Sequence, residues 1–142
     1  MRIERVGVIG SGLMGSGIAQ VAAYNGLNVT LVDVDQGRVD AAIDGIHRRL
    51  QREAERGRIS AADCEAAYQR LSGSADMDTL HSMARVDAVI EAVVEDLDIK
   101  SAVFKRLGEV CSPDALLASN TSSLPLSDLA AASGRPERVI GL

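Results

Sequence analysis

Aromatic residues are nearly absent from this 142-residue sequence, which has no Trp, one Phe and two Tyr. Its interior must therefore be built mainly from aliphatic side chains. The two cysteines, Cys64 and Cys111, are far apart, and neither a C-x-x-C pair nor a histidine at metal-ligand spacing accompanies them. This pattern excludes a disulfide-rich fold and argues against zinc or redox sites, so we expect two reduced, partly buried thiols and no bound metal.

Long apolar runs are also missing. Near the N-terminus only a short run, VGVI, precedes the glycines, which is too short for a signal peptide or a membrane span. We therefore expect a cytoplasmic protein without a membrane partner. The net charge of −5 gives no electrostatic reason to bind nucleic acid.

Basic residues gather in one place only, at residues 48–58. This cluster is either a solvated helix face, since glutamates are interleaved with it, or a weak candidate contact for an anionic group on a ligand. Its members are Arg48, Arg49, Arg52, Arg56 and Arg58.

Strand-like and helix-like segments alternate along the chain without repeats. The length suits one domain, residues 1–142, because domains most often hold roughly 100–150 residues. Asp35 and Asp98 are the predicted N-caps of the second and fourth helices, and Ser60 and Asp63 resemble a capping box. The alternation predicts an α/β fold, a parallel, doubly wound sheet. Strands are predicted at residues 3–9, 28–34, 71–76, 86–94, 115–118 and 139–142, and helices at 13–23, 35–56, 60–71, 98–112 and 125–132.

A glycine-rich turn, GSGLMG at residues 10–15, directly follows the first predicted strand and opens a helix. Gly10 permits a tight turn, Gly12 lets a pyrophosphate approach the backbone, and Gly15 allows close packing of the helix. The helix N-terminus then presents N–H groups and the positive end of its dipole to the phosphates. In this context the motif indicates a Rossmann-type dinucleotide-binding site rather than a structural glycine turn.

The second strand closes on an acidic residue, Asp33, about twenty residues beyond the glycines. Its carboxylate can accept hydrogen bonds from both hydroxyls of an adenosine ribose and would repel a 2′-phosphate, which favours NAD over NADP. Arg38 could soften this preference, although a helix-surface role is the simpler interpretation. His47 and His81 are both expected to have surface or structural roles.

Two further polar segments follow predicted strands, and ligands of open α/β sheets lie at the carboxyl ends of the strands. They are residues 91–95 (EAVVE) and residues 119–123 (SNTSS). The hydroxyls and amide of SNTSS could orient a nicotinamide or a substrate hydroxyl, or could simply form a turn and an N-cap before the helix that starts at Pro125. The residues alone leave these two alternatives open.

Four of these motifs together resemble the NAD-binding domain of the 3-hydroxyacyl-CoA dehydrogenase family. The matching text is VGVIGSGLMGSGIAQVAA, LVDVD, VIEAVVEDLDIKSAVFKRL and ASNTSSLPLSDLA, followed by RPERVIGL. The match covers almost the whole chain in order and is poorest over residues 57–85.

The resemblance implies a role for each matching residue. Ser122 would contact both the cofactor and the substrate's 3-hydroxyl, with Asn120 supporting the loop, and these two are the predicted catalytic residues in this chain. Arg56 stands near the place of a lysine that meets CoA in the family, but it is not a lysine, so it is only a weak candidate for a contact with the CoA substrate. The residues implied to bind NAD are Gly10, Ser11, Gly12, Leu13, Met14, Gly15, Asp33, Glu95, Lys100 and Ser122.

The implied reaction is the reversible oxidation of an L-3-hydroxyacyl-CoA thioester to a 3-ketoacyl-CoA, with hydride transfer to NAD⁺. In the family a histidine paired with a glutamate takes the hydroxyl proton, and it directly follows the segment matched by the last residues here. In the family, a helical C-terminal domain also closes the substrate site and forms a homodimer. Because the matched segments include neither this domain nor the histidine, we expect this chain alone to hold NAD but to be inactive. Alternatives are a stand-alone NAD-binding module or a related hydroxy-acid dehydrogenase that does not use CoA.

Overall fold

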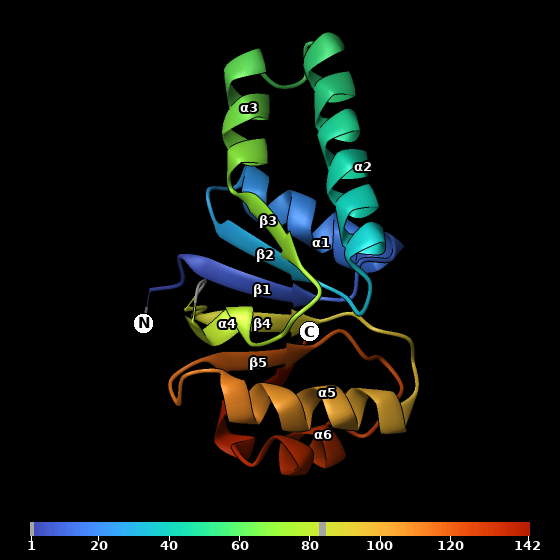
Figure 1. Cartoon of the computed structure of the whole chain (residues 1–142), viewed down its shortest axis with the longest axis vertical. Coiled ribbons are helices and arrows are strands. Elements are labelled where there is room, and N and C mark those ends of the chain that lie inside the picture. Colours follow the sequence, from blue (N-terminus) through green and yellow to red (C-terminus); the bar gives the residue numbers. More distant parts are fainter. Residues whose placement is uncertain (1, 83–84) are drawn as a thin grey trace.

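A single sheet of six parallel strands forms the centre of the molecule, in the order β3-β2-β1-β4-β5-β6 (Figure 1). The computed structural model describes residues 2–82 and 85–142. The strand order changes direction between β1 and β4, which makes this a Rossmann-type doubly wound sheet and confirms the predicted fold class. The strands are β1 Arg5–Ile9, β2 Asn28–Val32, β3 Leu71–Ser74, β4 Ala88–Glu91, β5 Leu116–Ser119 and β6 Val139–Gly141.

Helices cover both faces of the sheet. In Figure 1, α2 and α3 rise side by side at the top, whereas α5 and α6 lie together at the bottom. The helices are α1 Leu13–Tyr24, α2 Gln36–Glu55, α3 Ala61–Gln69, α4 Thr79–Ser82, α5 Leu97–Val110 and α6 Leu126–Ser133, with a short 3₁₀ helix, η1, at Pro136–Arg138.

Two separate apolar cores result, because successive residues of a strand point to opposite faces. Val8 and Leu31 pack with α1, α2 and α3 in one core, and their neighbours Ile9 and Val32 pack with α5 and α6 in the other. This two-sided burial explains why the strands read as continuous apolar runs.

The pair α5 and α6 packs unusually closely at Gly108. A Cβ at this position would lie 1.9 Å from the carbonyl oxygen of Ser133. Arg135, just after α6, ties the two helices by donating to the carbonyls of Gly108 at 2.5 Å and Cys111 at 3.0 Å. The half of the sheet that carries β4 and β5 therefore rests on a firmly held helix pair.

The N-caps of α2 and α3 are confirmed, whereas that of α5 was predicted wrongly. Asp35 accepts a hydrogen bond from the Gly37 amide, and Ser60 accepts one from the Asp63 amide. For α5 the cap is Asp96, which accepts from the Ile99 amide at 3.0 Å, and Asp98 lies in the first turn instead. Strand β4 is shorter than predicted, and α4 and η1 were not predicted at all.

Both cysteine thiols are free and buried, as expected. Burial raises the pKa of Cys111 to about 11, so its thiol stays protonated. His47 stacks on Tyr68, with ring centroids 3.8 Å apart, and so joins α2 to α3. The side chain of His81 lies outside the part that the structure describes. No helix in residues 2–82 and 85–142 is long and apolar enough to cross a membrane.

Candidate functional site

The glycine turn between β1 and α1 has the geometry that its sequence predicts. Gly10 has a φ of +105°, and a Cβ there would lie 2.6 Å from the carbonyl oxygen of Ala92. A Cβ at Gly15 would lie 1.8 Å from the Gly10 carbonyl oxygen, so the start of α1 can pack against the turn only if this residue is glycine. Around Gly12, by contrast, an added Cβ would meet nothing within 4 Å.

The N-terminus of α1 is open and lacks a side-chain cap. Its N-cap residue, Gly12, provides no oxygen, and the first turn contains no acidic residue. Neither the cap nor the first turn of α1 therefore neutralises the positive end of the helix dipole, which suits an anionic ligand. Leu13 and Met14 stand exposed beside this opening.

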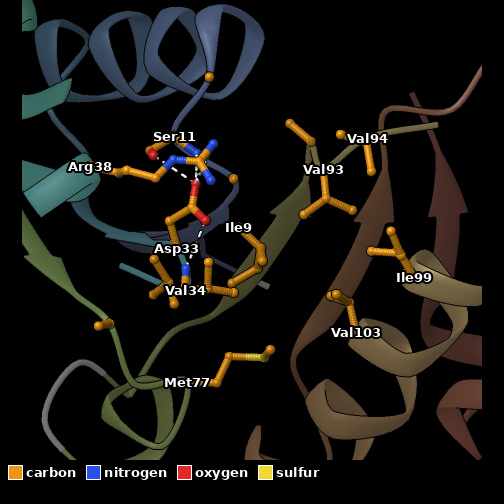
Figure 2. A pocket seen from close by; sticks show the side chains of 15 residues that line it. Ile9, Ser11, Asp33, Val34, Arg38, Met77, Val93, Val94, Ile99 and Val103 are labelled. Atoms are coloured by element: carbon orange, nitrogen blue, oxygen red, sulfur yellow. Dashed lines mark hydrogen bonds and ion pairs between the residues drawn. The ribbon is translucent and has the colours of Figure 1, made fainter. Parts of the chain in front are cut away.

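Asp33 lies immediately after β2 and faces the turn (Figure 2). Its Oδ2 accepts hydrogen bonds from the Ser11 amide at 2.8 Å and the Ser11 hydroxyl at 2.7 Å, and its Oδ1 accepts from the Val34 amide. Arg38 lies 3.9 Å from Oδ2. Burial alone would raise the pKa of Asp33, but the hydrogen bonds from Ser11 and Val34, together with the Arg38 charge, outweigh it and lower the pKa. The carboxylate is thus ionised at neutral pH.

A cavity of about 400 Å³ lies beside Asp33, in the range of small-molecule pockets. The polar groups of Ser11, Asp33 and Arg38 gather on one side, and apolar side chains form the opposite wall (Figure 2). That wall comes mainly from the β4–α5 loop and from α5, with Val34 after β2 and Met77 after β3 closing the rest. It comprises Val93, Val94, Ile99 and Val103.

A second group of polar side chains joins the loops that follow β4 and β5. We call it the loop network, and it consists of Glu91, Glu95, Lys100, Ser119, Thr121 and Ser123. At its centre Lys100 Nζ lies 2.5 Å from Glu91 Oε2, with side-chain exposures of 2% and 0%. Ser119 donates to the other carboxylate oxygen of Glu91 at 2.6 Å.

Glu95 forms the outer part of the loop network. Its two carboxylate oxygens accept hydrogen bonds from Thr121 at 2.7 Å and Ser123 at 3.2 Å, and Lys100 Nζ lies 3.5 Å away. The Thr121 hydrogen bond lowers the pKa of Glu95, and the charge of Lys100 and the Ser123 hydrogen bond act in the same direction against desolvation. A negative charge therefore stands at the exposed rim of this loop.

Asn120 and Ser122, the predicted catalytic residues, project from the same loop. The backbone N–H of Asn120 donates to the backbone carbonyl of Glu91 at 2.9 Å, which extends the pairing of β4 and β5 by one hydrogen bond. Within residues 2–82 and 85–142, neither the Asn120 side chain nor the Ser122 hydroxyl has a hydrogen-bond partner, and Ser122 is exposed. Both groups are thus available to a ligand.

Lys100 is buried, and Arg56 lies at the far end of α2. The family resemblance implies that Lys100 lies on the nicotinamide side of a cofactor, and the structure places its ammonium inside the loop network. Arg56 is the C-cap of α2, at the end of the α2–α3 pair far from α5 and α6 in Figure 1, with Glu53 at 4.0 Å. Neither residue lines the cavity, and of the other predicted site residues Gly10, Ser11, Gly12 and Asp33 do.

The sequence interpretation missed the buried partnership of Glu91 and Lys100. For α5 the apolar spacing predicts one stripe, formed by Ile99, Ala102, Val103, Leu107 and Val110. Ile99 and Ala102 are exposed instead, and the buried residues of this helix are Lys100, Phe104, Leu107 and Val110. The spacing of those four residues by three or four was the available signal. An acidic residue inside an apolar strand, facing a lysine on an apolar helix stripe, indicates a buried pair.

Comparisons with a family model and with known proteins point to the same family. Residues 5–142 match the model described as "3-hydroxyacyl-CoA dehydrogenase, NAD binding domain". The chain is 46% identical over 142 residues to a 3-hydroxyadipyl-CoA dehydrogenase of Escherichia coli (strain K12), covering all of this chain and 29% of that protein. It is 41% identical over 142 residues to a probable 3-hydroxybutyryl-CoA dehydrogenase of Bacillus subtilis (strain 168), covering all of this chain and 48% of that protein.

A solved structure agrees with these matches. The crystal structure of a 3-hydroxybutyryl-CoA dehydrogenase from Escherichia coli K12 superimposes with a TM-score of 0.94 at 45% identity, covering all of this chain and 29% of that one. The chain therefore spans less than half the length of these relatives.

Proposed function

The chain belongs to the 3-hydroxyacyl-CoA dehydrogenase family as an NAD-binding domain, and from this we propose how its residues hold NAD and which reaction they serve. The observation that carries the proposal is the open backbone at Gly12, in front of a helix N-terminus that has no cap of its own. In a doubly wound sheet a dinucleotide lies across the carboxyl ends of the strands at the point where the order reverses, here β1 and β4.

The pyrophosphate belongs at the turn of residues 10–15. Gly12 leaves the space that the phosphates need, and the N–H groups and dipole of α1 supply hydrogen bonds and positive potential. Ser11, Leu13 and Met14 border the same opening, so their backbone and side chains would contact the middle of the dinucleotide. The turn of residues 10–15 and the start of α1 thus fit a bound pyrophosphate.

The adenosine half belongs in the cavity beside Asp33. The ionised carboxylate accepts hydrogen bonds from the ribose hydroxyls, for which the Ser11 hydroxyl has to give up its own bond to Oδ2. The apolar wall around Val34 and Ile99 suits the flat faces of an adenine ring. A 2′-phosphate would meet the negative charge of Asp33, which supports a preference for NAD over NADP. Among the described residues that line the cavity, Arg38 is the one positive charge that could offset it.

The nicotinamide half belongs over the ends of β4 and β5. Bound NAD supplies there a hydride acceptor at its nicotinamide ring. Ser122 offers a free hydroxyl to the cofactor and to a substrate hydroxyl, Asn120 offers an amide, and Glu95 provides a negative charge at the rim. We propose that Ser122 and Asn120 orient the reacting alcohol, while the proton acceptor of a full-length family member is a histidine paired with a glutamate, as the family resemblance implies.

The proposed substrate is an L-3-hydroxyacyl-CoA thioester, oxidised to the 3-ketoacyl-CoA. The names of the two relatives support this class and differ in the acyl group, 3-hydroxybutyryl in one and 3-hydroxyadipyl in the other. Arg56, on the exposed end of α2, would contact an anionic group of CoA. We further propose that the full-length protein is a cytoplasmic homodimer, which rests on the family resemblance.

A pair of glycine substitutions in α1 and its turn tests the cofactor site. Gly12 has an extended backbone that alanine also adopts and no neighbour within 4 Å of an added Cβ, so Gly12→Ala should fold normally. Its methyl group would nevertheless occupy the approach of the pyrophosphate, and we expect NADH affinity in calorimetry to fall by at least about tenfold. Gly17→Ala, which is equally free of contacts, is the control and should keep its affinity. Equal NADH affinity in both variants would refute the proposed pyrophosphate site.

The substrate class needs a separate measurement. Acetoacetyl-CoA should bind the NADH-loaded chain in calorimetry, and Arg56→Ala should weaken this binding. Arg2→Ala is the control, because Arg2 is likewise exposed and paired with a glutamate, Glu4, but lies outside the basic cluster of residues 48–58. NADH binding without any binding of acetoacetyl-CoA would instead favour a cofactor-binding module or a dehydrogenase that does not use CoA.

A further inference from the structure

The loop network contains a buried charge pair that the cofactor cavity does not account for. Glu91 ends β4 and Lys100 lies one turn into α5, and neither side chain reaches the cavity or the surface. A buried ion pair is weak evidence for stability, because apolar side chains of similar volume are often as stable at such positions. The pair therefore calls for another explanation.

The ammonium group of Lys100 has no donor left for a ligand. It carries three N–H donors, and three acceptors surround it: Glu91 Oε2 at 2.5 Å, the Val93 carbonyl at 3.2 Å and Glu95 Oε1 at 3.5 Å. With 2% of its side chain exposed, Lys100 is a link between two glutamates and the β4–α5 loop. A direct contact with a cofactor would require it to leave one of them.

Both glutamates hold the loop that follows β5. Glu91 accepts from the Ser119 hydroxyl, which in turn accepts from the Thr121 amide at 3.2 Å. Glu95 accepts from the Thr121 hydroxyl, which also accepts from the Leu124 amide at 3.1 Å. The path from Lys100 through Glu91 and Ser119 to the loop backbone is thus continuous, and every hydrogen bond along it is 3.2 Å or shorter.

The odd-numbered and even-numbered residues of the loop differ in where their side chains bind. Ser119, Thr121 and Ser123 point their hydroxyls at the two glutamates. The residues between them, Asn120 and Ser122, keep side chains without a partner in the described part of the chain. Fixing the odd-numbered residues therefore fixes the direction of the even-numbered ones, which are the groups proposed to meet the ligand.

We propose that Glu91 and Lys100 are positioning residues, which hold the loop of residues 119–123 so that Asn120 and Ser122 face the nicotinamide half of the cofactor without touching it themselves. This inference rests on the proposed function. It differs from a direct cofactor contact by Lys100, because it makes Ser119 and Thr121 as important as the lysine. It also predicts that the loop network affects the binding of the nicotinamide half of the ligand and leaves the binding of the adenosine half unchanged.

Two ligands and two conservative variants test the proposal by calorimetry. NADH reaches the ends of β4 and β5, whereas ADP carries only the adenosine and the pyrophosphate. Ser119→Ala removes the hydroxyl that joins Glu91 to the loop, and Thr121→Val removes the hydroxyl that joins Glu95 to it. Both variants leave the Glu91–Lys100 pair in place. We expect NADH affinity to fall about tenfold, the order of one lost hydrogen bond to a charged group, while ADP affinity stays within about twofold.

A double variant, Glu91→Gln with Lys100→Met, removes both charges without leaving either one unpaired, and it should show the same selective loss. Lys105→Met makes the same change on the exposed side of α5 and should bind both ligands as the wild type does. Equal losses for NADH and ADP, or unchanged NADH affinity in folded Ser119→Ala and Thr121→Val, would overturn the proposal. So would a loss of NADH affinity confined to substitutions of Lys100. If the wild type bound neither ligand, the proposed cofactor site itself would fail.

Discussion

Lys100 Nζ and Glu91 Oε2 lie 2.5 Å apart in the interior, where both side chains are at most 2% exposed. The pair connects β4 to α5, and through Ser119 it also reaches β5. Charges in such a position are tolerated only when they are paired and hydrogen-bonded, which the contacts with Ser119 and with the Val93 backbone provide. The site region of this domain is therefore sensitive to the loss of either partner.

Breaking this pair should destabilise the fold far more than removing it. Lys100→Met leaves the buried Glu91 carboxylate without a counter-charge, and we expect the free energy of unfolding to drop by about 3–5 kcal/mol. Glu91→Gln leaves the Lys100 ammonium with Glu95 at 3.5 Å as its remaining counter-charge, so we expect a smaller drop. The double variant should recover most of that loss. Urea unfolding curves of the three variants check this, with the exposed Lys105→Met as control. A double variant as unstable as the sum of the single ones would show that the two charges do not depend on each other.

The turn at the start of α1 should tolerate no methyl group at Gly15. A Cβ there would lie 1.8 Å from the Gly10 carbonyl oxygen, so Gly15→Ala must displace either the helix or the turn. We expect a loss of about 2 kcal/mol or more in stability, in the range of overpacked sites. Gly17→Ala, two residues along the same helix and free of close contacts, should instead stabilise by about 0.5–1 kcal/mol. Thermal unfolding followed by circular dichroism compares the two, and similar midpoints would contradict the packing argument.

Local chemistry explains which parts of the site were predictable from sequence. The turn of residues 10–15 and the place of Asp33 follow from short-range rules, because a strand, glycines and a helix in succession restrict the backbone strongly. The choice of Asp96 over Asp98 as the cap of α5 could not be predicted, since the two acids lie two residues apart and only the direction of the incoming chain decides between them.

Contacts between distant segments explain what was missed. The inner face of α5 was predicted from apolar residues alone. Lys100 was left off this face because a lysine is rarely buried. Its burial depends on Glu91, nine residues earlier, and on Ser119, which lies on another strand. The two alternatives for residues 119–123 likewise could not be separated by sequence, because the loop contains both kinds of residue. Thr121 and Ser123 form the turn, whereas the side chains of Asn120 and Ser122 have no hydrogen-bond partner among residues 2–82 and 85–142.

Asp33 and Arg38 should together determine the choice between the two dinucleotides. Asp33→Asn removes the charge that repels a 2′-phosphate and releases Arg38, 3.9 Å away, to pair with it. We expect NADH binding to weaken by about 1–3 kcal/mol, the cost of losing its ribose hydrogen bonds, and NADPH binding to improve. Calorimetry with both ligands measures the change. Adding Arg38→Ala to Asp33→Asn should abolish the gain for NADPH, and a gain that persists would show that Arg38 is not the phosphate partner.

Asp87 should make the domain sensitive to acid. Its Oδ2 accepts hydrogen bonds from the backbone amides of Glu4 at 2.9 Å and Arg5 at 3.0 Å, which hold the start of β1. These two bonds lower the pKa of Asp87 below its ordinary value of 3.8, despite the opposing effect of burial. A carboxyl whose pKa is lower in the folded state contributes stability above its unfolded pKa, and that contribution is lost as the pH falls through the folded pKa.

The measurable consequence is a stability difference that depends on pH. Wild type should exceed Asp87→Asn by about 1–2 kcal/mol at pH 7, and the difference should shrink as the pH falls below about 4. Urea unfolding at pH 7, 5, 4 and 3 measures it. Asp44→Asn is the control, because Asp44 is exposed on α2 and has no hydrogen bond or ion pair in the described part of the chain. A difference between wild type and Asp87→Asn that stayed constant down to pH 3 would mean that the two amide bonds do not favour the charged form, and that Asp87 holds β1 by shape rather than by charge.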